Sequence, residues 1–378
     1  MLKNPKVLLI LATAMNLRLA ITAVTPLFTA IQRSLHVTSS LTALLITLPL
    51  LCFSLGAIAT PHLIQRFGPT TLLWTTNALL LLASLLRPVT TDLLLTTTIV
   101  IGLAVAILNV LVPTLIAQTT VTGATRLTSA YAVTMNVVAA LGTAIAIPLA
   151  TQFSWQLVLQ GFGLPALVTL ALLWWAPHHL FAQPTTDSAP SVSLRATLQH
   201  DKQARWLTVF MGLQSLIFYS LTTWLPTIFH ALDATTATSG NLLAVFQLVG
   251  IPAALVLTRV TNLRYLLWSL LVGYAVGGLT LLWPGLGWWL AAGLLGFTSS
   301  LIFTLALTLI ATSSSHVNAI ANRSAVAQSL GYLLAAVGPV LLGQIHDFTG
   351  SWGPVLGVLG GLVLLTIGVG LRLTRTSH

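Results

Sequence analysis

Residues 7–31 read VLLILATAMNLRLAITAVTPLFTAI, an apolar run with a single charge, Arg18, near its middle. A transmembrane helix needs about 20 consecutive, mostly apolar residues, so this run is long enough to cross a bilayer. Lys3 and Lys6 precede it, as basic residues precede a signal peptide. The apolar part of a signal peptide is only roughly 7–15 residues long, however. The segment therefore predicts a first, retained transmembrane helix.

The composition of the whole chain is that of a polytopic membrane protein. Of the 378 residues, 56% are hydrophobic and 5% are charged, whereas soluble domains carry roughly 25% charged residues. So few charges cannot cover the surfaces of globular domains. Cys52 is the only cysteine, which excludes an intrachain disulfide and a cysteine metal cluster. Neither paired carboxylates nor histidines at metal-ligand spacing lie inside an apolar segment, so we expect no cofactor and no enzyme.

Apolar segments of span length occur six on each side of a polar stretch. The twelve predicted spans are 7–31, 40–62, 70–87, 93–116, 127–150, 157–176, 206–230, 240–258, 265–283, 288–311, 324–346 and 352–371. We predict two six-helix halves, 1–176 and 206–378, joined by a central loop, 177–205. Twelve of the fifteen Lys and Arg residues fall in loops or tails on one side. This bias marks the cytoplasmic side and places both termini there; it also explains the net charge of +10 without a nucleic-acid partner.

The two halves resemble each other at fixed offsets. The matching pairs are Arg126 with Arg323 and Trp155 with Trp352, each 197 residues apart, and Pro26 with Pro226, 200 residues apart. Together they indicate a duplicated six-helix unit. Parallel repeats around a central site are the architecture of major-facilitator transporters.

Several short segments carry a family resemblance, and they run in order from the first span to the last. They are Asn16–Arg18, Val24–Leu27, Leu48–Leu50, Asn109–Pro113, Trp224–Pro226 and Ala327–Pro339. These segments resemble the bacterial cyanate and 2-nitroimidazole permease family of the major facilitator superfamily. The resemblance implies a multi-pass transporter of the bacterial cytoplasmic membrane. One departure is the loop Gln65-Arg66-Phe67-Gly68, which lacks the aspartate that the superfamily usually has before its basic residue.

Helical spacing selects the polar residues of the first span that share a face. Arg18, Thr22, Thr25 and Thr29 follow the i, i+4, i+7, i+11 pattern of one helical stripe. We predict that Arg18, Thr22 and Thr25 bind the substrate.

The seventh span presents a matching face, on which the 200-residue offset maps Arg18 to Phe218. The residues predicted to bind substrate there are Ser215, Phe218, Tyr219 and Thr222. They give this half an aromatic, hydroxylated wall.

A further stripe in the eleventh span contains Gln328 and Tyr332, four residues apart. The 197-residue offset maps Gln328 to Tyr131 in the fifth span. Asn109, an isolated amide near a proline in the fourth span, completes the predicted substrate site.

Other polar and aromatic residues receive structural interpretations. Asn136 lies on a different face of the fifth span from Tyr131 and is left out of the site. Asn16 and Asn77 are predicted to mediate helix packing. Arg87, near the outer end of the third span, is predicted to snorkel to the membrane interface, and Trp224 to join the interfacial aromatic belt.

For the threonines a structural role is an open alternative, because threonine in a membrane helix commonly bonds its own i−4 carbonyl. Buried Tyr and Gln likewise often hold helices together, by bonds averaging roughly 0.6 kcal/mol. Arg18 differs, because placing an arginine at a helix centre costs at least ~2.5–3.5 kcal/mol. Since none of the five aspartates lies inside a predicted span and glutamate is absent, we expect the substrate to be its partner.

These residues favour a permease for a small anionic or electronegative solute, such as cyanate or a nitro-aromatic. It would act as a monomer in the lipid bilayer on a small-molecule substrate. The alternative is a broad-specificity exporter of hydrophobic drugs, for which an aromatic cavity suffices. A non-transporting receptor has no support, because no soluble output domain accompanies the spans.

A proton relay through the middle of the membrane is not expected. Such relays commonly use Asp, Glu or His inside the membrane, and Arg18 stays protonated. We therefore favour facilitated diffusion or exchange over coupling through the adjacent pair His346 and Asp347, at the end of a span.

Overall fold

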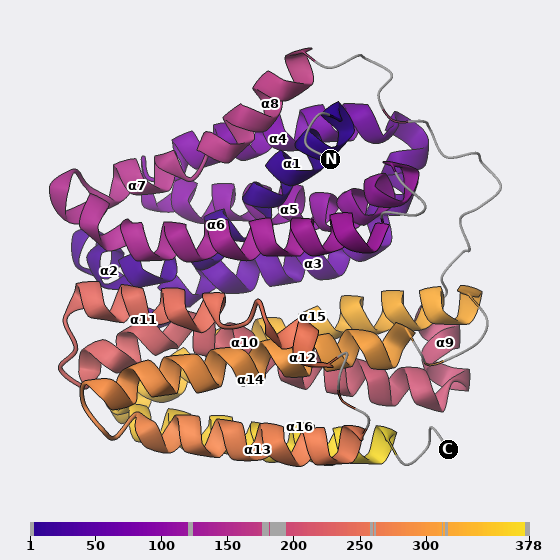
Figure 1. The fold of residues 1–378 in the computed structure, drawn as a ribbon. Coiled ribbons are helices and arrows are strands. Elements are labelled where there is room, and N and C mark those ends of the chain that lie inside the picture. The colour runs from indigo at the N-terminus through magenta and orange to yellow at the C-terminus, as the bar shows by residue number, and fades with distance from the viewer. Residues whose placement is uncertain are drawn as a thin grey trace. The chain divides into compact units, whose positions relative to one another are not determined.

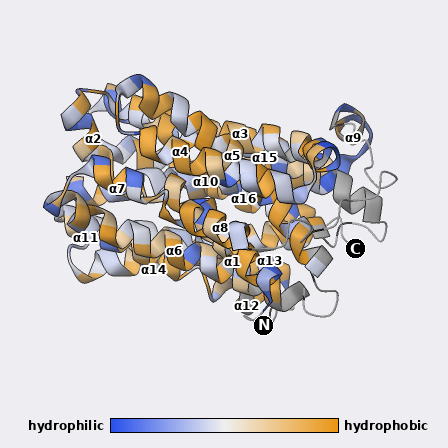
Figure 2. Ribbon diagram, turned by 90° about the horizontal axis from the view of Figure 1, so that it is seen from above, coloured by the Kyte–Doolittle hydropathy of each residue, from blue (hydrophilic) through white to orange (hydrophobic). Residues whose placement is uncertain are grey.

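The computed structural model describes residues 4–119, 124–175, 181, 194–257, 260, 262–311, 313 and 317–374. Within these ranges every regular element is a helix. Eleven helical segments of the described chain are long and apolar enough to cross a membrane. Hydrophobic residues occur along most of the helices, whereas α9 is largely hydrophilic (Figure 2). The predicted all-α, polytopic fold is confirmed; the count of twelve spans and the side of the termini stay predictions.

In the described part of its first half, the chain forms eight α-helices and one 3₁₀ turn (Figure 1). They are α1 (Pro5–Thr22), η1 (Thr25–Leu27), α2 (Phe28–Leu35), α3 (Ser39–Phe67), α4 (Pro69–Leu86), α5 (Thr91–Thr119), α6 (Ala124–Gln152), α7 (Trp155–Gly161) and α8 (Leu164–Trp175).

Among the described residues of the second half there are eight further helices (Figure 1). They are α9 (Leu194–His200), α10 (Lys202–Ala231), α11 (Thr236–Leu248), α12 (Ala253–Leu257), α13 (Leu263–Thr280), α14 (Leu286–Ala311), α15 (Val317–Thr349) and α16 (Trp352–Leu373).

The chain forms two compact units. The first comprises Met1–Val37 with Leu48–Ala189, and the second comprises Thr38–Thr47 with Pro190–His378. Much of the predicted central loop 177–205 lies outside the described residues, and the predicted domain bounds stay predictions.

In the first unit, α1 packs against α5, α6 and α8. A polar contact fixes α1 to α4 and α8: the Asn16 amide donates to Asn77 Oδ1 at 3.5 Å and to Thr169 Oγ1 at 3.3 Å. Asn16 and Asn77 are both buried. This contact confirms the packing role predicted for these two asparagines.

In the second unit, α10 and α15 pack along each other. Glycines permit this approach, because a Cβ atom added at Gly331 would lie 3.2 Å from the backbone nitrogen of Gly212. Trp224 is fully buried and donates its indole N–H to the Pro339 carbonyl at 2.9 Å. The prediction that Trp224 belongs to an interfacial belt is wrong, because the α10–α15 contact covers the ring.

The predicted span 240–258 is interrupted. Helix α11 ends at Leu248, a turn follows, and α12 begins at Ala253, directly after Pro252. Proline disfavours helical backbone in the residue before it, which accounts for a break here. Neither piece alone is long enough to be counted among the eleven candidate spans.

Candidate functional site

Arg18 on α1 contacts α6 through a residue that is not among the predicted site residues. Its Nη1 donates to Asn136 Oδ1 at 2.7 Å. Arg18 is only partly buried. Asn136, which helical phase placed outside the predicted site, is therefore hydrogen-bonded to the central residue of that site. Asn136 differs from Tyr131 in helical phase, but a long arginine side chain reaches residues outside a single narrow stripe. An isolated amide in the middle of an apolar span was the available signal for this contact.

Tyr131 belongs to the same environment. The positive charge of Arg18 acts electrostatically on its hydroxyl. The prediction grouped Arg18 and Tyr131 in one site, and the structure brings them together. Helix α6 thus carries the amide that accepts from Arg18 and, five residues earlier, a phenol within electrostatic range of its charge.

The threonines of the Arg18 stripe bond to backbone. Thr22 Oγ1 donates to the Arg18 carbonyl and Thr25 Oγ1 donates to the Thr22 carbonyl, both at 3.1 Å. Both threonines are buried. These contacts support the structural alternative, while substrate contacts by Thr22 and Thr25 stay predictions. Asn109 lies partly buried on α5, before Pro113 in the same helix, and its role also stays a prediction.

The second unit holds an aromatic cluster, which we define as Phe218, Tyr219, Phe246 and Tyr332. Ring centroids lie 5.3 Å apart for Phe218 and Tyr219, 5.8 Å for Phe218 and Phe246, and 6.4 Å for Tyr219 and Tyr332. The cluster joins α10, α11 and α15. The structure therefore brings together three predicted site residues. The fourth ring, Phe246, was missed because a phenylalanine within an apolar span has no polar group to single it out.

Polar groups accompany these rings on α10 and α15. Gln328 donates to Ser324 Oγ at 2.8 Å, as expected for neighbours on one helical face. Ser215 Oγ accepts from Gln214 Nε2 at 2.7 Å. Thr222 is fully buried, and its hydroxyl has no hydrogen-bond partner among the described residues.

Arg87 is not at the surface. The side chain is 1% exposed, and it donates from Nε to Thr98 Oγ1 at 3.1 Å and from Nη1 to the Ala20 carbonyl at 2.7 Å. The prediction that Arg87 snorkels to the interface is wrong. Its position at the end of α4 suggested exposure, but α1 and α5 cover that end and offer oxygen acceptors.

A cluster of charges fixes the start of α10. Arg323 Nε donates to Asp201 Oδ2 at 2.6 Å, and Nη1 donates to Gln203 Oε1 at 2.9 Å and to the Ser313 carbonyl. Asp201 also caps α10 by accepting from the backbone N–H of Gln203 and Ala204. Partial burial acts to raise the pKa of the Asp201 carboxyl, but these backbone bonds and the Arg323 guanidinium outweigh it and hold that pKa below its usual value.

The sequence model of one protein family, the Major Facilitator Superfamily, matches residues 9–339. The chain belongs to the major facilitator superfamily. It is 35% identical over 370 residues to the uncharacterized transporter YycB of Bacillus subtilis, covering 94% of this chain and 90% of that protein. It is 35% identical over 371 residues to the 2-nitroimidazole transporter of Escherichia coli, covering 94% and 92%.

The chain also matches the cyanate transport protein CynX of Escherichia coli, with 26% identity over 359 residues and 91% of each chain covered. The predicted resemblance to the cyanate and 2-nitroimidazole permease family is confirmed. Among solved structures, the nucleoside transporter NupG gives a TM-score of 0.78 at 11% identity, covering 98% of this chain and all of that one. The D-xylose–proton symporter gives 0.75 at 13% identity, covering 97% and 96%. At such identities these two structures show the fold alone.

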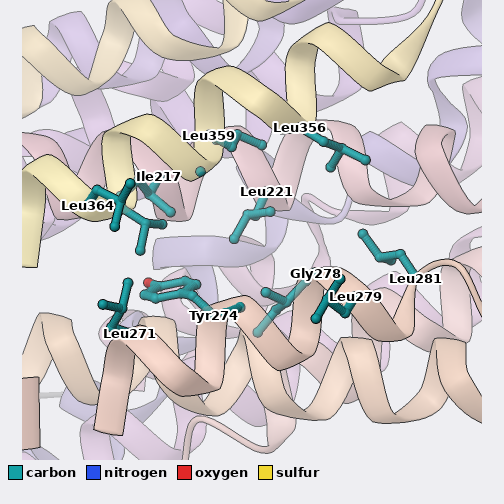
Figure 3. A pocket seen from close by; sticks show the side chains of 14 residues that line it. Ile217, Leu221, Leu271, Tyr274, Gly278, Leu279, Leu281, Leu356, Leu359 and Leu364 are labelled. Atoms are coloured by element: carbon teal, nitrogen blue, oxygen red, sulfur yellow. The ribbon is translucent and has the colours of Figure 1, made fainter. Parts of the chain in front are cut away.

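This major-facilitator chain has an apolar cavity in its second unit, between α10, α13, α14 and α16, with a volume of about 490 Å³. Figure 3 shows Leu271 and Tyr274 of α13 across from Leu359 and Leu364 of α16. The Tyr274 hydroxyl donates to Ser299 Oγ at 3.1 Å. None of the predicted site residues lines this cavity, whose walls suit apolar groups rather than an anion.

The first unit contains a comparable apolar cavity of about 470 Å³, between α1, α6, α7 and α8. Met15 and Leu19 of α1 line it, but Arg18 does not. Like the first cavity, it matches apolar groups.

Proposed function

We propose that this transporter is a permease that moves a small anionic or electronegative solute, such as cyanate or a nitro-aromatic, by alternating access. It would work as a monomer in the bacterial cytoplasmic membrane, with both termini in the cytoplasm and with no nucleic-acid partner. The superfamily membership and the two relatives named for 2-nitroimidazole and cyanate support this class of cargo.

The observation that carries the proposal is the hydrogen bond between Arg18 and Asn136. The acceptor is a neutral amide, so the bond orients the guanidinium while the positive charge is retained. A guanidinium forms charge-assisted hydrogen bonds with anionic oxygens, and these are roughly twice as strong as neutral ones. The nearby Tyr131 hydroxyl adds a donor for the same cargo.

Arg18 does not act as a proton carrier in this mechanism, because a guanidinium stays protonated in proteins. We favour facilitated diffusion or exchange, in which cargo binding alone stabilises the states between the two open forms. If protons are coupled, His346 and Asp347 are the candidates: His346 Nδ1 lies 3.6 Å from Asp347 Oδ1, and Asp347 Oδ2 accepts from Ser40 at 2.7 Å.

Uptake into proteoliposomes tests the proposal. Radiolabelled cyanate and 2-nitroimidazole should enter vesicles containing the parent protein, and Arg18→Gln should reduce uptake at least about tenfold, the equivalent of one charge-assisted hydrogen bond. Arg33→Met is the matched control, because Arg33 is an exposed arginine on α2. Equal uptake by Arg18→Gln and the parent would contradict the role of Arg18 in cargo binding.

The second candidate is a broad exporter of hydrophobic compounds, and the aromatic cluster favours it. Aromatic rings stack on many apolar molecules without a requirement for charge. That function predicts mutual competition among chemically unrelated drugs and little sensitivity to Arg18→Gln. The proposed permease predicts competition among small electronegative solutes only.

A further inference from the structure

The first span is broken one turn after Arg18. Helix α1 ends at Thr22, and η1 begins at Thr25, directly before Pro26. A proline has no N–H to donate to the carbonyl four residues earlier, which for Pro26 is that of Thr22. The Thr25 hydroxyl donates to this carbonyl instead. The end of α1 therefore depends on side chains for its hydrogen bonds.

Arg87, at the end of α4, donates a hydrogen bond to this end of α1. It donates to the Ala20 carbonyl at 2.7 Å, and it is anchored on α5 by its bond to Thr98. Cations are favourable near the C-terminal end of a helix, where the carbonyl dipoles point outward. One guanidinium thus connects α4, α5 and the broken end of α1.

Complete burial of Arg87 is costly, which argues for a specific role. Removing a charged group from water is strongly unfavourable, whereas a hydrogen bond donated by a charged group is stronger than one between neutral groups. The two bonds offset much of the penalty only while both acceptors stay in place. Displacement of the Ala20 carbonyl is therefore strongly opposed.

We propose that Arg87 is a positioning residue for transport: by holding the broken end of α1, it fixes the place of Arg18, two residues before Ala20 on the same helix. Arg87 acts through the α1 backbone. This inference rests on the proposed role of Arg18 in cargo binding.

Two measurements on the full-length protein in proteoliposomes test it, with radiolabelled cyanate as the probe. The first is KM and maximal rate per folded protein for Arg87→Met, Arg87→Lys, Thr98→Val and the control Arg33→Met. Arg87→Met should raise KM about tenfold with a smaller effect on maximal rate. Arg87→Lys should recover part of the loss, because one ammonium can still donate to the Ala20 carbonyl. Thr98→Val, which keeps the shape of the side chain, should raise KM about two- to threefold.

The second measurement needs no cargo. Amide hydrogen exchange over residues 15–28 should be faster in Arg87→Met and Thr98→Val than in the parent, and unchanged in Arg33→Met. If Arg87→Met does not fold, Thr98→Val and Arg87→Lys decide the outcome.

Faster exchange together with raised KM supports the inference. A purely structural Arg87 would lower the yield of folded protein while KM and exchange in the folded fraction stay at parental values, and that result would overturn it. A parent protein that does not transport cyanate contradicts the proposed function instead, so the two failures are distinguishable.

Discussion

Arg18 on α1 and Asn136 on α6 share a 2.7 Å hydrogen bond in which a guanidinium donates to a neutral amide. The bond joins the charge to the helix that also carries Tyr131. Because the acceptor is a neutral amide, this bond by itself does not neutralise the guanidinium, whereas a bond to a carboxylate would.

Replacing the amide by a carboxylate tests that distinction. Asn136→Asp gives Arg18 a resident counter-ion that competes with the cargo, so we expect KM for cyanate to rise about tenfold or more while thermal stability is kept or increased. Asn136→Leu removes the bond but leaves the charge, and should have the smaller effect on KM. Proteoliposome uptake measures both. An unchanged KM in Asn136→Asp would count against anion binding at Arg18.

The aromatic cluster should distinguish a flat cargo from a small linear one. An aromatic pair contributes about 0.5–1.5 kcal/mol beyond area burial, so Tyr332→Leu should weaken 2-nitroimidazole binding several-fold and leave cyanate binding little changed. Tyr332→Phe keeps the ring and is the matched control. Competition of each compound against labelled cyanate uptake gives both affinities; equal losses for the two cargoes would argue against a role for the ring in stacking.

The contact between Asn16 and Asn77 should affect stability alone. Asn77→Ala removes the acceptor at 3.5 Å and leaves a small cavity, and such bonds in membrane helices average roughly 0.6 kcal/mol. We expect a lower melting temperature with KM for cyanate at the parental value, measured on the same purified sample. A raised KM would show that this contact also positions the Arg18 face of α1.

The Asp201–Arg323 pair predicts a pH-dependent stability. Because the pKa of Asp201 is lowered in the folded state from its usual value of 3.8, its stabilising contribution is complete above the unfolded pKa and is lost as pH falls through the folded pKa. Asp201→Asn keeps a capping side chain but removes the charge, and should cost about 1 kcal/mol at neutral pH.

The measurement is the difference in melting temperature between the parent and Asp201→Asn as a function of pH. It should be constant above about pH 5 and shrink as the pH falls below 3.8. Asp233→Asn, at an exposed aspartate, is the matched control. A difference that grows on acidification would contradict the assignment of the pair.

The fold was predictable because bilayer thickness fixes span length, and the apolar runs in this sequence have that length. What composition could not show is where a span breaks: the interruption before Pro252 depends on local backbone geometry. The grouping of Phe218, Tyr219 and Tyr332 was accessible from helical spacing, since rings at related phases of packed helices converge.

The errors share a physical cause. Arg87 and Trp224 were each judged by their distance from the end of their own helix. Their actual surroundings come from neighbouring helices: Ala20 and Thr98 around Arg87, and the Pro339 carbonyl beside Trp224. Such contacts between segments distant in sequence carry no local signal.

Ligand-dependent thermal stabilisation of purified protein tests the central claim, that Arg18 binds an electronegative cargo, most directly. A ligand that binds only the folded state stabilises it by RT ln(1 + [L]/Kd), about 2.7 kcal/mol at one hundred times Kd. Titration with cyanate and with 2-nitroimidazole should raise the melting temperature of the parent and of the Arg33→Met control, and should raise that of Arg18→Gln by about half as much or less, since a tenfold weaker ligand at the same concentration stabilises by only about 1.4 kcal/mol. Equal stabilisation of Arg18→Gln and the parent by these compounds would contradict the claim.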